Sequence, residues 1–280
     1  MSSLELNLNL NLPCAWVIFE NKIYFSSHRV MENAPLDTPI FRLVAGLQVL
    51  FGVDSYRPLR QHLNLNYKPT LFCKSVVKVC AKRMRHIENI PSFHLDCFDY
   101  VEVGFLGLNK INDIAQEQNK KFNYLRDKNL ISTAEIAKEL KLMLEIESEK
   151  IPLFEKNRNV SCFIENHLKQ ICAHSHNQSK FLKIAHAELL AAWQYQKEYQ
   201  NKFDQNTNIY CTLKPCKMCA AALWQMSSHW QSLSVSYLEF DEGPMARSTI
   251  LNANSTDRQL EIGKQDGENK LELESFLKLS

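Results

Sequence analysis

Three side chains of types that bind metal ions are spaced in a way that constrains the fold of this chain more than any other feature. His186 precedes Cys216 by 30 positions and Cys219 by 33. Two cysteines at i and i+3 at the start of a helix point the same way, and a helix N-terminus favours their thiolate form. The histidine stands at the start of another predicted helix. The chain must therefore bring the starts of two helices together.

These three ligands predict a zinc site with an open position. Structural zinc sites close all four positions with protein ligands, whereas catalytic sites keep one for water, whose pKa the metal lowers to about 7. Glu188 lies two residues from the histidine and is left free to carry protons. We therefore expect one Zn²⁺ per chain, in the C-terminal domain, with Glu188 as the catalytic acid and base. The alternative is a structural zinc, for which the fourth ligand would be His229, Cys211 or His174.

The motif His186-Ala187-Glu188, followed by Pro215-Cys216-Lys217-Met218-Cys219, resembles the signature of the zinc nucleobase deaminases. Residues 210–223 (Tyr-Cys-Thr-Leu-Lys-Pro-Cys-Lys-Met-Cys-Ala-Ala-Ala-Leu) are similar to the cytidine deaminase superfamily, and most similar to its tRNA-specific adenosine deaminase branch. The resemblance covers about residues 133–280. It implies a three-layer α/β/α catalytic domain and a zinc-dependent hydrolytic deaminase.

The same resemblance implies where substrate is bound. Asn177 stands nine residues before the zinc-binding histidine, where the family has a base-binding asparagine, and Ala187 is expected beside the base. His174 and His176 flank Asn177 as further candidates, although the interpretation as ordinary polar loop residues is favoured. Arg247 follows the loop expected at the pocket mouth and is a candidate phosphate contact.

Strands that alternate with helices predict a layered α/β architecture in both halves of the chain. Expected strands cover residues 16–19, 23–25, 100–105, 160–165, 169–174, 209–213 and 233–240, and residues 4–12 alternate like an edge strand. Expected helices cover 40–51, 74–87, 186–203 and 215–226, with Asp37 and Thr38 capping the first of them. We expect a first domain over residues 1–125 and the catalytic domain over residues 126–280.

The two halves share a pattern that predicts an internal repeat. Residues 18–21 parallel 163–166, and residues 40–45 would replace 186–191, so that the histidine and the glutamate are lost. Residues 70–76 track 212–219 with one gap, keeping one cysteine and placing Val76 at the other. The hypothesis is a degenerate, zinc-less deaminase-like first domain, and the alternative is an unrelated α/β domain. A fused copy that replaces a partner subunit predicts a monomer, and otherwise we expect a homodimer.

Composition narrows the function classes. The balance of 33 Lys and Arg against 31 Asp and Glu is too even for nucleic-acid binding by bulk charge, and no Gly-rich phosphate-binding motif is present. The chain shows no export signal and no membrane-length apolar stretch, and its nine cysteines are odd in number. We therefore expect a cytoplasmic protein with reduced thiols that does not enter a membrane.

One local patch leaves nucleic-acid binding open. Lys78, Lys82, Arg83 and Arg85 fall on the basic face of the helix expected over residues 74–87, which fits a nucleic-acid footprint and a solvated face equally well. The preferred substrate is an adenine or cytosine base in RNA, such as tRNA. A free nucleobase, a nucleoside or a related heterocycle such as guanine is the first alternative. A further alternative is an inactive nucleic-acid-binding protein that has kept the fold.

Overall fold

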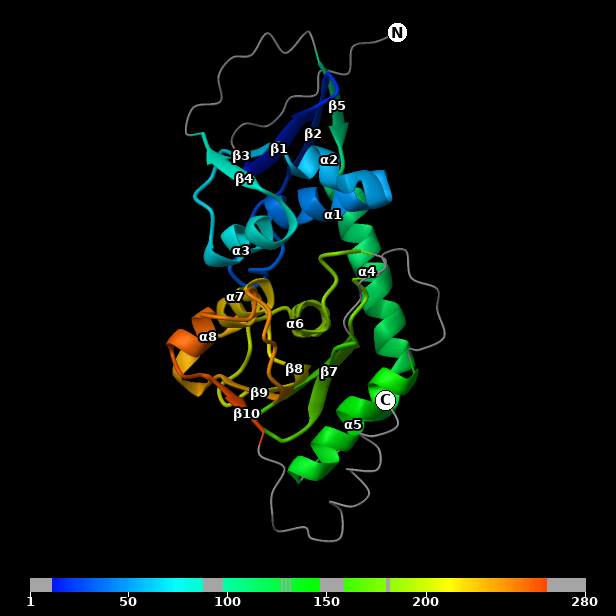
Figure 1. Ribbon diagram of the computed structural model, residues 1–280, viewed down its shortest axis with the longest axis vertical. Helices are drawn as coiled ribbons and strands as arrows, with labels where there is room; N and C mark the ends of the chain where they lie inside the picture. The colour runs from blue at the N-terminus through cyan, green and yellow to red at the C-terminus, as the bar shows by residue number, and fades with distance from the viewer. Residues whose placement is uncertain are drawn as a thin grey trace.

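The computed structural model describes residues 12–87, 98–126, 128, 130, 132–146, 159–179 and 182–260 (Figure 1). The strand expected over residues 4–12 lies almost wholly outside them. The described part contains two mixed five-stranded sheets and their helices, which confirms the predicted α/β class. We call residues 14–102 the first half and residues 161–259 the second half.

The first half is built on a sheet with the strand order β4-β3-β1-β2-β5. Its strands are β1 (Cys14–Phe19), β2 (Lys22–Ser27), β3 (His62–Leu65), β4 (Arg83–His86) and β5 (Asp99–Glu102). Its helices are α1 (Pro39–Phe51), α2 (Tyr56–Leu59) and α3 (Leu71–Cys80), with a 3₁₀ turn at Gly52–Ser55. As predicted, Thr38 caps α1, because its hydroxyl accepts a hydrogen bond from the Phe41 backbone N–H.

The second half has a sheet with the order β10-β9-β8-β6-β7. Its strands are β6 (Ser161–Glu165), β7 (Ile171–His176), β8 (Asn208–Leu213), β9 (Ser234–Glu239) and β10 (Asp257–Gln259). Its helices are α6 (Ala187–Tyr199), α7 (Lys217–Met226) and α8 (Ile250–Ala253), with a 3₁₀ turn at Trp230–Ser232. Apolar side chains of the β-strands and of these helices form the core, and β7 is buried along its whole length.

Four strands of each sheet have the same topology. β1 pairs antiparallel with β2 and β3, and β3 pairs parallel with β4, just as β6 pairs antiparallel with β7 and β8, and β8 pairs parallel with β9. α1 and α6 each follow the hairpin, and α3 and α7 each join the parallel pair. The fifth strands differ, because β5 extends the sheet beside β2 whereas β10 extends it beside β9.

Helix caps fix the register between the halves and correct the alignment drawn from the sequence. Thr38 and His186 are the N-caps of α1 and α6, and Thr70 and Cys216 are the N-caps of α3 and α7. Thr38 therefore stands opposite His186, where the sequence alignment placed Ile40.

The same register changes the partner of the retained cysteine. Cys73 follows its cap by three residues, as Cys219 does, so it corresponds to Cys219 and not to Cys216. The sequence carried this signal as Lys68-Pro69-Thr70-Leu71-Phe72-Cys73 against Lys214-Pro215-Cys216-Lys217-Met218-Cys219.

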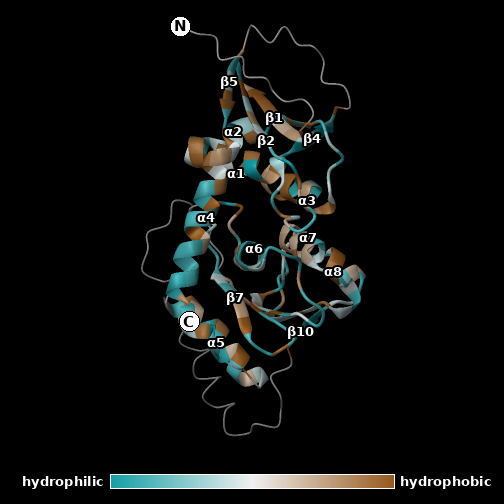
Figure 2. Cartoon of the chain, turned by 180° about the vertical axis from the view of Figure 1, so that it is seen from behind, coloured by the Kyte–Doolittle hydropathy of each residue, from teal (hydrophilic) through white to brown (hydrophobic). Residues whose placement is uncertain are grey.

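α4 (Gly104–Lys121) runs alongside both halves, and α5 (Thr133–Ile146) follows it after a 3₁₀ turn at Asn123–Leu125 (Figure 1). α4 crosses α1 closely, because a Cβ on Gly107 would lie 2.5 Å from the Gly46 backbone nitrogen. Toward the second half, its Asn112 accepts a hydrogen bond from the Trp193 indole at 3.0 Å. Much of α4 is hydrophilic, in contrast to β1, as Figure 2 shows. The predicted boundary near residue 125 thus falls just after a helix that contacts both sheets.

Two expected elements differ from those observed. The helix expected over residues 74–87 ends at Cys80, and Arg83–His86 instead forms β4, because these residues find a parallel partner in β3. Lys82, Arg83 and Arg85 therefore do not share a helix face with Lys78. The strand expected to reach residue 105 ends at Glu102, and α4 begins at Gly104. No helix among the described residues has the length and apolarity that a membrane span requires.

Candidate active site

The starts of α6 and α7 bring the three predicted metal ligands together. His186 caps α6, Cys216 caps α7, and Cys219 lies in the first turn of α7. The Nδ1 atom of His186 is 3.5 Å from the Sγ atom of each cysteine, and all three ligand atoms lie within 4.8 Å of one another. Among the residues that the structure describes, these are the ones that form a potential metal-binding group of three or more.

The donor set of this group suits zinc. Two thiols and one imidazole are the ligand types that zinc prefers. The neighbouring Cys219 thiol, with His186 beside it, holds the pKa of Cys216 well below its ordinary value, so a thiolate is already favoured. The alternative fourth ligands lie elsewhere, since Cys211 packs against Cys162 at 3.6 Å between sulfurs and His229 is exposed. His174 is likewise outside the group.

Glu188 lies in the first turn of α6 with its side chain directed to the cluster. The residue is 4% exposed, and the Cys219 thiol donates to its Oε2 atom at 3.4 Å. Burial, together with the nearby Cys216 thiolate, raises the pKa of Glu188 to about 7. A carboxyl group held near its pKa at neutral pH can both accept and return a proton.

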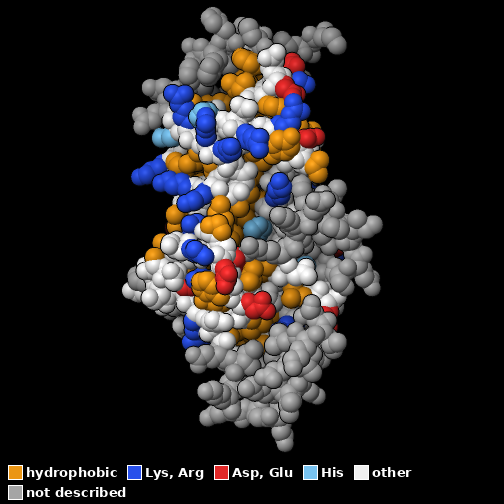
Figure 3. Space-filling view, viewed as in Figure 1, with side chains coloured by type: hydrophobic (Ala, Val, Ile, Leu, Met, Phe, Trp, Pro, Cys, Tyr) orange, Lys and Arg blue, Asp and Glu red, His pale blue; other side chains and the backbone are white. Residues whose placement is uncertain are grey.

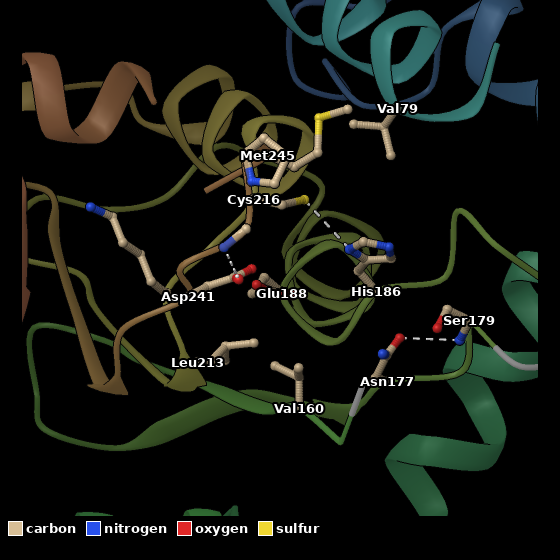
Figure 4. Close-up of a pocket in the computed structure, with 13 residues that line it drawn as sticks. Val79, Val160, Asn177, Ser179, His186, Glu188, Leu213, Cys216, Asp241 and Met245 are labelled. Atoms are coloured by element: carbon tan, nitrogen blue, oxygen red, sulfur yellow. Dashed lines mark hydrogen bonds between the residues drawn. The ribbon is translucent and has the colours of Figure 1, made fainter. Parts of the chain in front are cut away.

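A cavity of about 270 Å³ opens over the cluster and Glu188 (Figure 4). Val160 and Leu213 supply apolar wall, and Asn177 supplies a polar edge, with its Oδ1 accepting a hydrogen bond from the Ser179 N–H at 3.1 Å. Val79 comes from α3 of the first half. The complete lining is Val79, Val160, Asn177, Ser179, His186, Glu188, Leu213, Lys214, Cys216, Asp241, Gly243, Pro244 and Met245.

The other predicted substrate contacts lie outside this lining. Ala187 is the buried first residue of α6, and Arg247 is exposed two residues beyond Met245. His174 and His176 are not loop residues, because both lie in β7 and are buried within the fold. Sequence reasoning missed Val79 and Asp241; no motif marks Val79, whereas Asp241 belongs to the loop expected at the pocket mouth.

The predicted basic patch is exposed but divided between elements. Lys78 lies on α3 beside Val79, Lys82 follows that helix, and Arg83 and Arg85 lie on β4. Lys and Arg side chains gather on the part of the surface formed by the first half, as Figure 3 shows. These charges therefore lie on the other half of the chain from the three ligands, next to a helix that reaches the pocket.

The fold and the site together define a deaminase-type catalytic domain. Residues 152–262 match the model of a family described as Bd3614-like deaminase. This domain belongs to the cytidine deaminase-like superfamily, as the motif predicted. No curated protein matches the chain.

Solved structures with a similar fold include three deaminases of different substrates. A tRNA A34 deaminase that carries out A-to-I editing is 20% identical, with 36% of this chain and 76% of that chain covered and a TM-score of 0.31. A dCMP deaminase from the cyanophage S-TIM5 is 18% identical, with 45% and 94% covered and a TM-score of 0.32. A guanine deaminase from Nitrosomonas europaea is 12% identical, with 47% and 78% covered and a TM-score of 0.35. At these values, the likenesses carry no inference about substrate.

Proposed function

We propose that the chain is a zinc-dependent hydrolytic deaminase of an amino-substituted nucleobase. The observation that carries this proposal is the placement of Glu188 in one cavity with a three-ligand cluster of His186, Cys216 and Cys219. A structural zinc would need a fourth protein ligand and no neighbouring acid, whereas hydrolysis needs both an open position and a proton carrier.

The residues of the cavity have separate roles in this reaction. Zinc, held by the two cysteines and the histidine, would supply a Lewis acid and an activated water molecule. The Glu188 carboxylate accepts the proton of the attacking water, delivers it to a ring nitrogen, and later protonates the departing amine, which leaves as ammonia. The Asn177 amide is placed at the cavity edge to hydrogen-bond the base, and Val160 and Leu213 provide apolar surface for the ring.

Glu188→Gln tests the assignment of the proton carrier. The substitution keeps the size and hydrogen-bonding capacity of the side chain but removes its basicity. We expect ammonia release from the best substrate to fall by about 100-fold or more, while metal analysis still finds one zinc per chain. Equal activity in the variant would contradict the proposed mechanism, and loss of zinc from the variant would make Glu188 a structural residue.

We favour a base within RNA, such as an adenine or cytosine of tRNA, as the substrate. Residues 55–87 contain eight Lys and Arg and no Asp or Glu, in a chain whose net charge is only +2. This acid-free segment includes α3, whose Val79 lines the cavity and whose Lys78 is exposed beside it. Local positive charge next to a base-sized cavity supports a substrate that carries phosphates.

A free nucleobase, nucleoside or related heterocycle such as guanine is the second candidate. The observation that favours it is the cavity volume of about 270 Å³, which lies at the lower end of the range of roughly 300 Å³ and above that is typical of ligand pockets. An inactive nucleic-acid-binding protein would show neither activity.

Sequencing of small RNA after incubation with the protein separates these candidates. We expect A-to-G or C-to-U changes with the wild-type chain and none with Glu188→Gln. Lys78→Glu with Lys82→Glu should reduce these changes and flatten the salt dependence by about 1 per lost phosphate contact. Lys110→Glu with Lys138→Glu, at exposed positions of α4 and α5, alters net charge equally and is the matched control. Ammonia release from free bases without RNA changes would favour the small-molecule reaction.

A further inference from the structure

Two glutamines form equivalent hydrogen bonds in opposite directions between the halves. Gln48 of α1 accepts from the Ile184 backbone N–H at 3.2 Å, and Gln196 of α6 accepts from the Leu36 backbone N–H at 3.0 Å. Each glutamine stands ten residues after its helix cap, and each N–H belongs to the residue two positions before the other cap. Such reciprocity is the mark of a two-fold interface between like subunits.

The helices α3 and α7 repeat this reciprocity. Val79 and Gln225 are the ninth residues of these ten-residue helices. Val79 lines the cavity of the second half, while Gln225 accepts from the Phe72 N–H at 3.4 Å and donates to the Pro35 carbonyl at 3.3 Å in the first half. Each half thus extends one helix over the site region of the other.

The corresponding site of the first half is filled by a tyrosine. Tyr67 stands three residues before Thr70, as Leu213 stands three residues before its cap. Its hydroxyl accepts a hydrogen bond from the Ile40 N–H at 3.2 Å and lies 3.7 Å from the Cys73 sulfur. The hydroxyl therefore lies among the residues that replace Glu188 and one metal ligand. The metal site of the second half has no counterpart there.

From these contacts, we infer that the first half serves as a built-in partner subunit and that Gln48 is a positioning residue for the metal ligand His186. The inference rests on the proposed function. Gln48 is 3% exposed, and its Oε1 holds Ile184, whose carbonyl in turn accepts from the His186 N–H at 2.9 Å. The glutamine thereby fixes the short turn from which the imidazole projects.

A pair of matched variants tests this role. Gln48→Leu and Gln196→Leu each remove one buried interface hydrogen bond of the same kind, but only the first of these bonds holds the metal-binding turn. Zinc affinity is measured by competition with a chelator, and the ligand geometry by the absorption spectrum of the Co²⁺-substituted protein. We expect about a 10-fold loss of zinc affinity and an altered Co²⁺ spectrum for Gln48→Leu alone.

The control measurements make each outcome decisive. Thermal unfolding should show similar destabilisation of the two variants, and Gln48→Glu, which keeps an acceptor oxygen, should recover zinc affinity. If either leucine variant fails to fold, Gln48→Met and Gln196→Met replace the pair. Equal zinc affinity in both variants would overturn the inference and leave the proposed function standing. A wild-type chain that binds no zinc would overturn both.

Discussion

The rings of Phe41 and Trp193 meet across the boundary between the two halves, with their centroids 5.4 Å apart. Phe41 belongs to α1 and also packs against Phe72 of α3, at 5.6 Å between centroids, while Trp193 belongs to the helix that carries Glu188. Both rings are almost completely buried. One aromatic cluster thus joins the core of the first half to the helix that positions the catalytic acid.

Removal of this aromatic contact should weaken both halves at once. Phe41→Ala is expected to lower the free energy of unfolding by about 3 kcal/mol, because it leaves a cavity between packed rings. Denaturant unfolding, followed by Trp fluorescence and by zinc release, should show the two signals shifting together. Zinc release that is unchanged while fluorescence shifts would indicate that the halves unfold independently.

The two equivalent cysteines Cys73 and Cys219 should respond differently to the same substitution. Cys219→Ala removes a ligand from the metal group, whereas Cys73→Ala removes a thiol that faces Tyr67 and Thr70. We expect metal analysis to find zinc lost from the first variant and one zinc per chain in the second. Zinc loss from Cys73→Ala without unfolding would show a metal site in the first half.

Val79 should affect substrate selection although it lies on the first half. Val79→Phe would fill part of the cavity, so we expect kcat/KM to fall by about 10-fold or more, with the largest effect on the bulkiest base. Zinc content should remain unchanged, because Val79 is not in the metal group. Val53→Phe at an exposed position of the same half is the control for the added ring. An unaltered substrate profile would place Val79 outside the binding site.

His174 should make the protein sensitive to acid. Burial lowers its pKa from 6.5 to about 4, and neither of its ring nitrogens has a hydrogen-bond partner among the described residues. Because the unfolded chain takes up the proton first, stability is full above pH 6.5 and falls as the pH drops from 6.5 to 4, by about 3 kcal/mol in total. His174→Leu should flatten this part of the pH profile in urea unfolding. An identical slope in the variant would assign the acid sensitivity to another group.

The sequence predicted the chemistry of the site better than its walls. The spacing of His186, Cys216 and Cys219 was sufficient, because helix starts bring such residues together through local geometry alone. Thr38 was also recognisable as a cap, since a threonine followed by proline and an apolar run is a local signal. Val79 was not predicted, because its place in the cavity depends on packing between residues far apart in the chain.

The errors of register have the same physical origin. Arg83–His86 has the charge pattern of a solvated helix, and only its pairing with β3 makes it a strand. The repeat was aligned by apolar similarity, whereas the structure aligns it by helix caps, where Thr70 replaces Cys216. A cap is a single residue, so its weight in an alignment becomes visible only when the helix that it begins is known.

Because α4 packs against both halves, the first half is supplied to the second at an effective concentration that does not change when the protein is diluted. Two separate subunits would part at low concentration, and a metal-binding turn that depends on a neighbour would then loosen. In a single chain, the contact between Gln48 and Ile184 is independent of expression level. The helix that joins the halves thus makes the integrity of the site a property of each molecule.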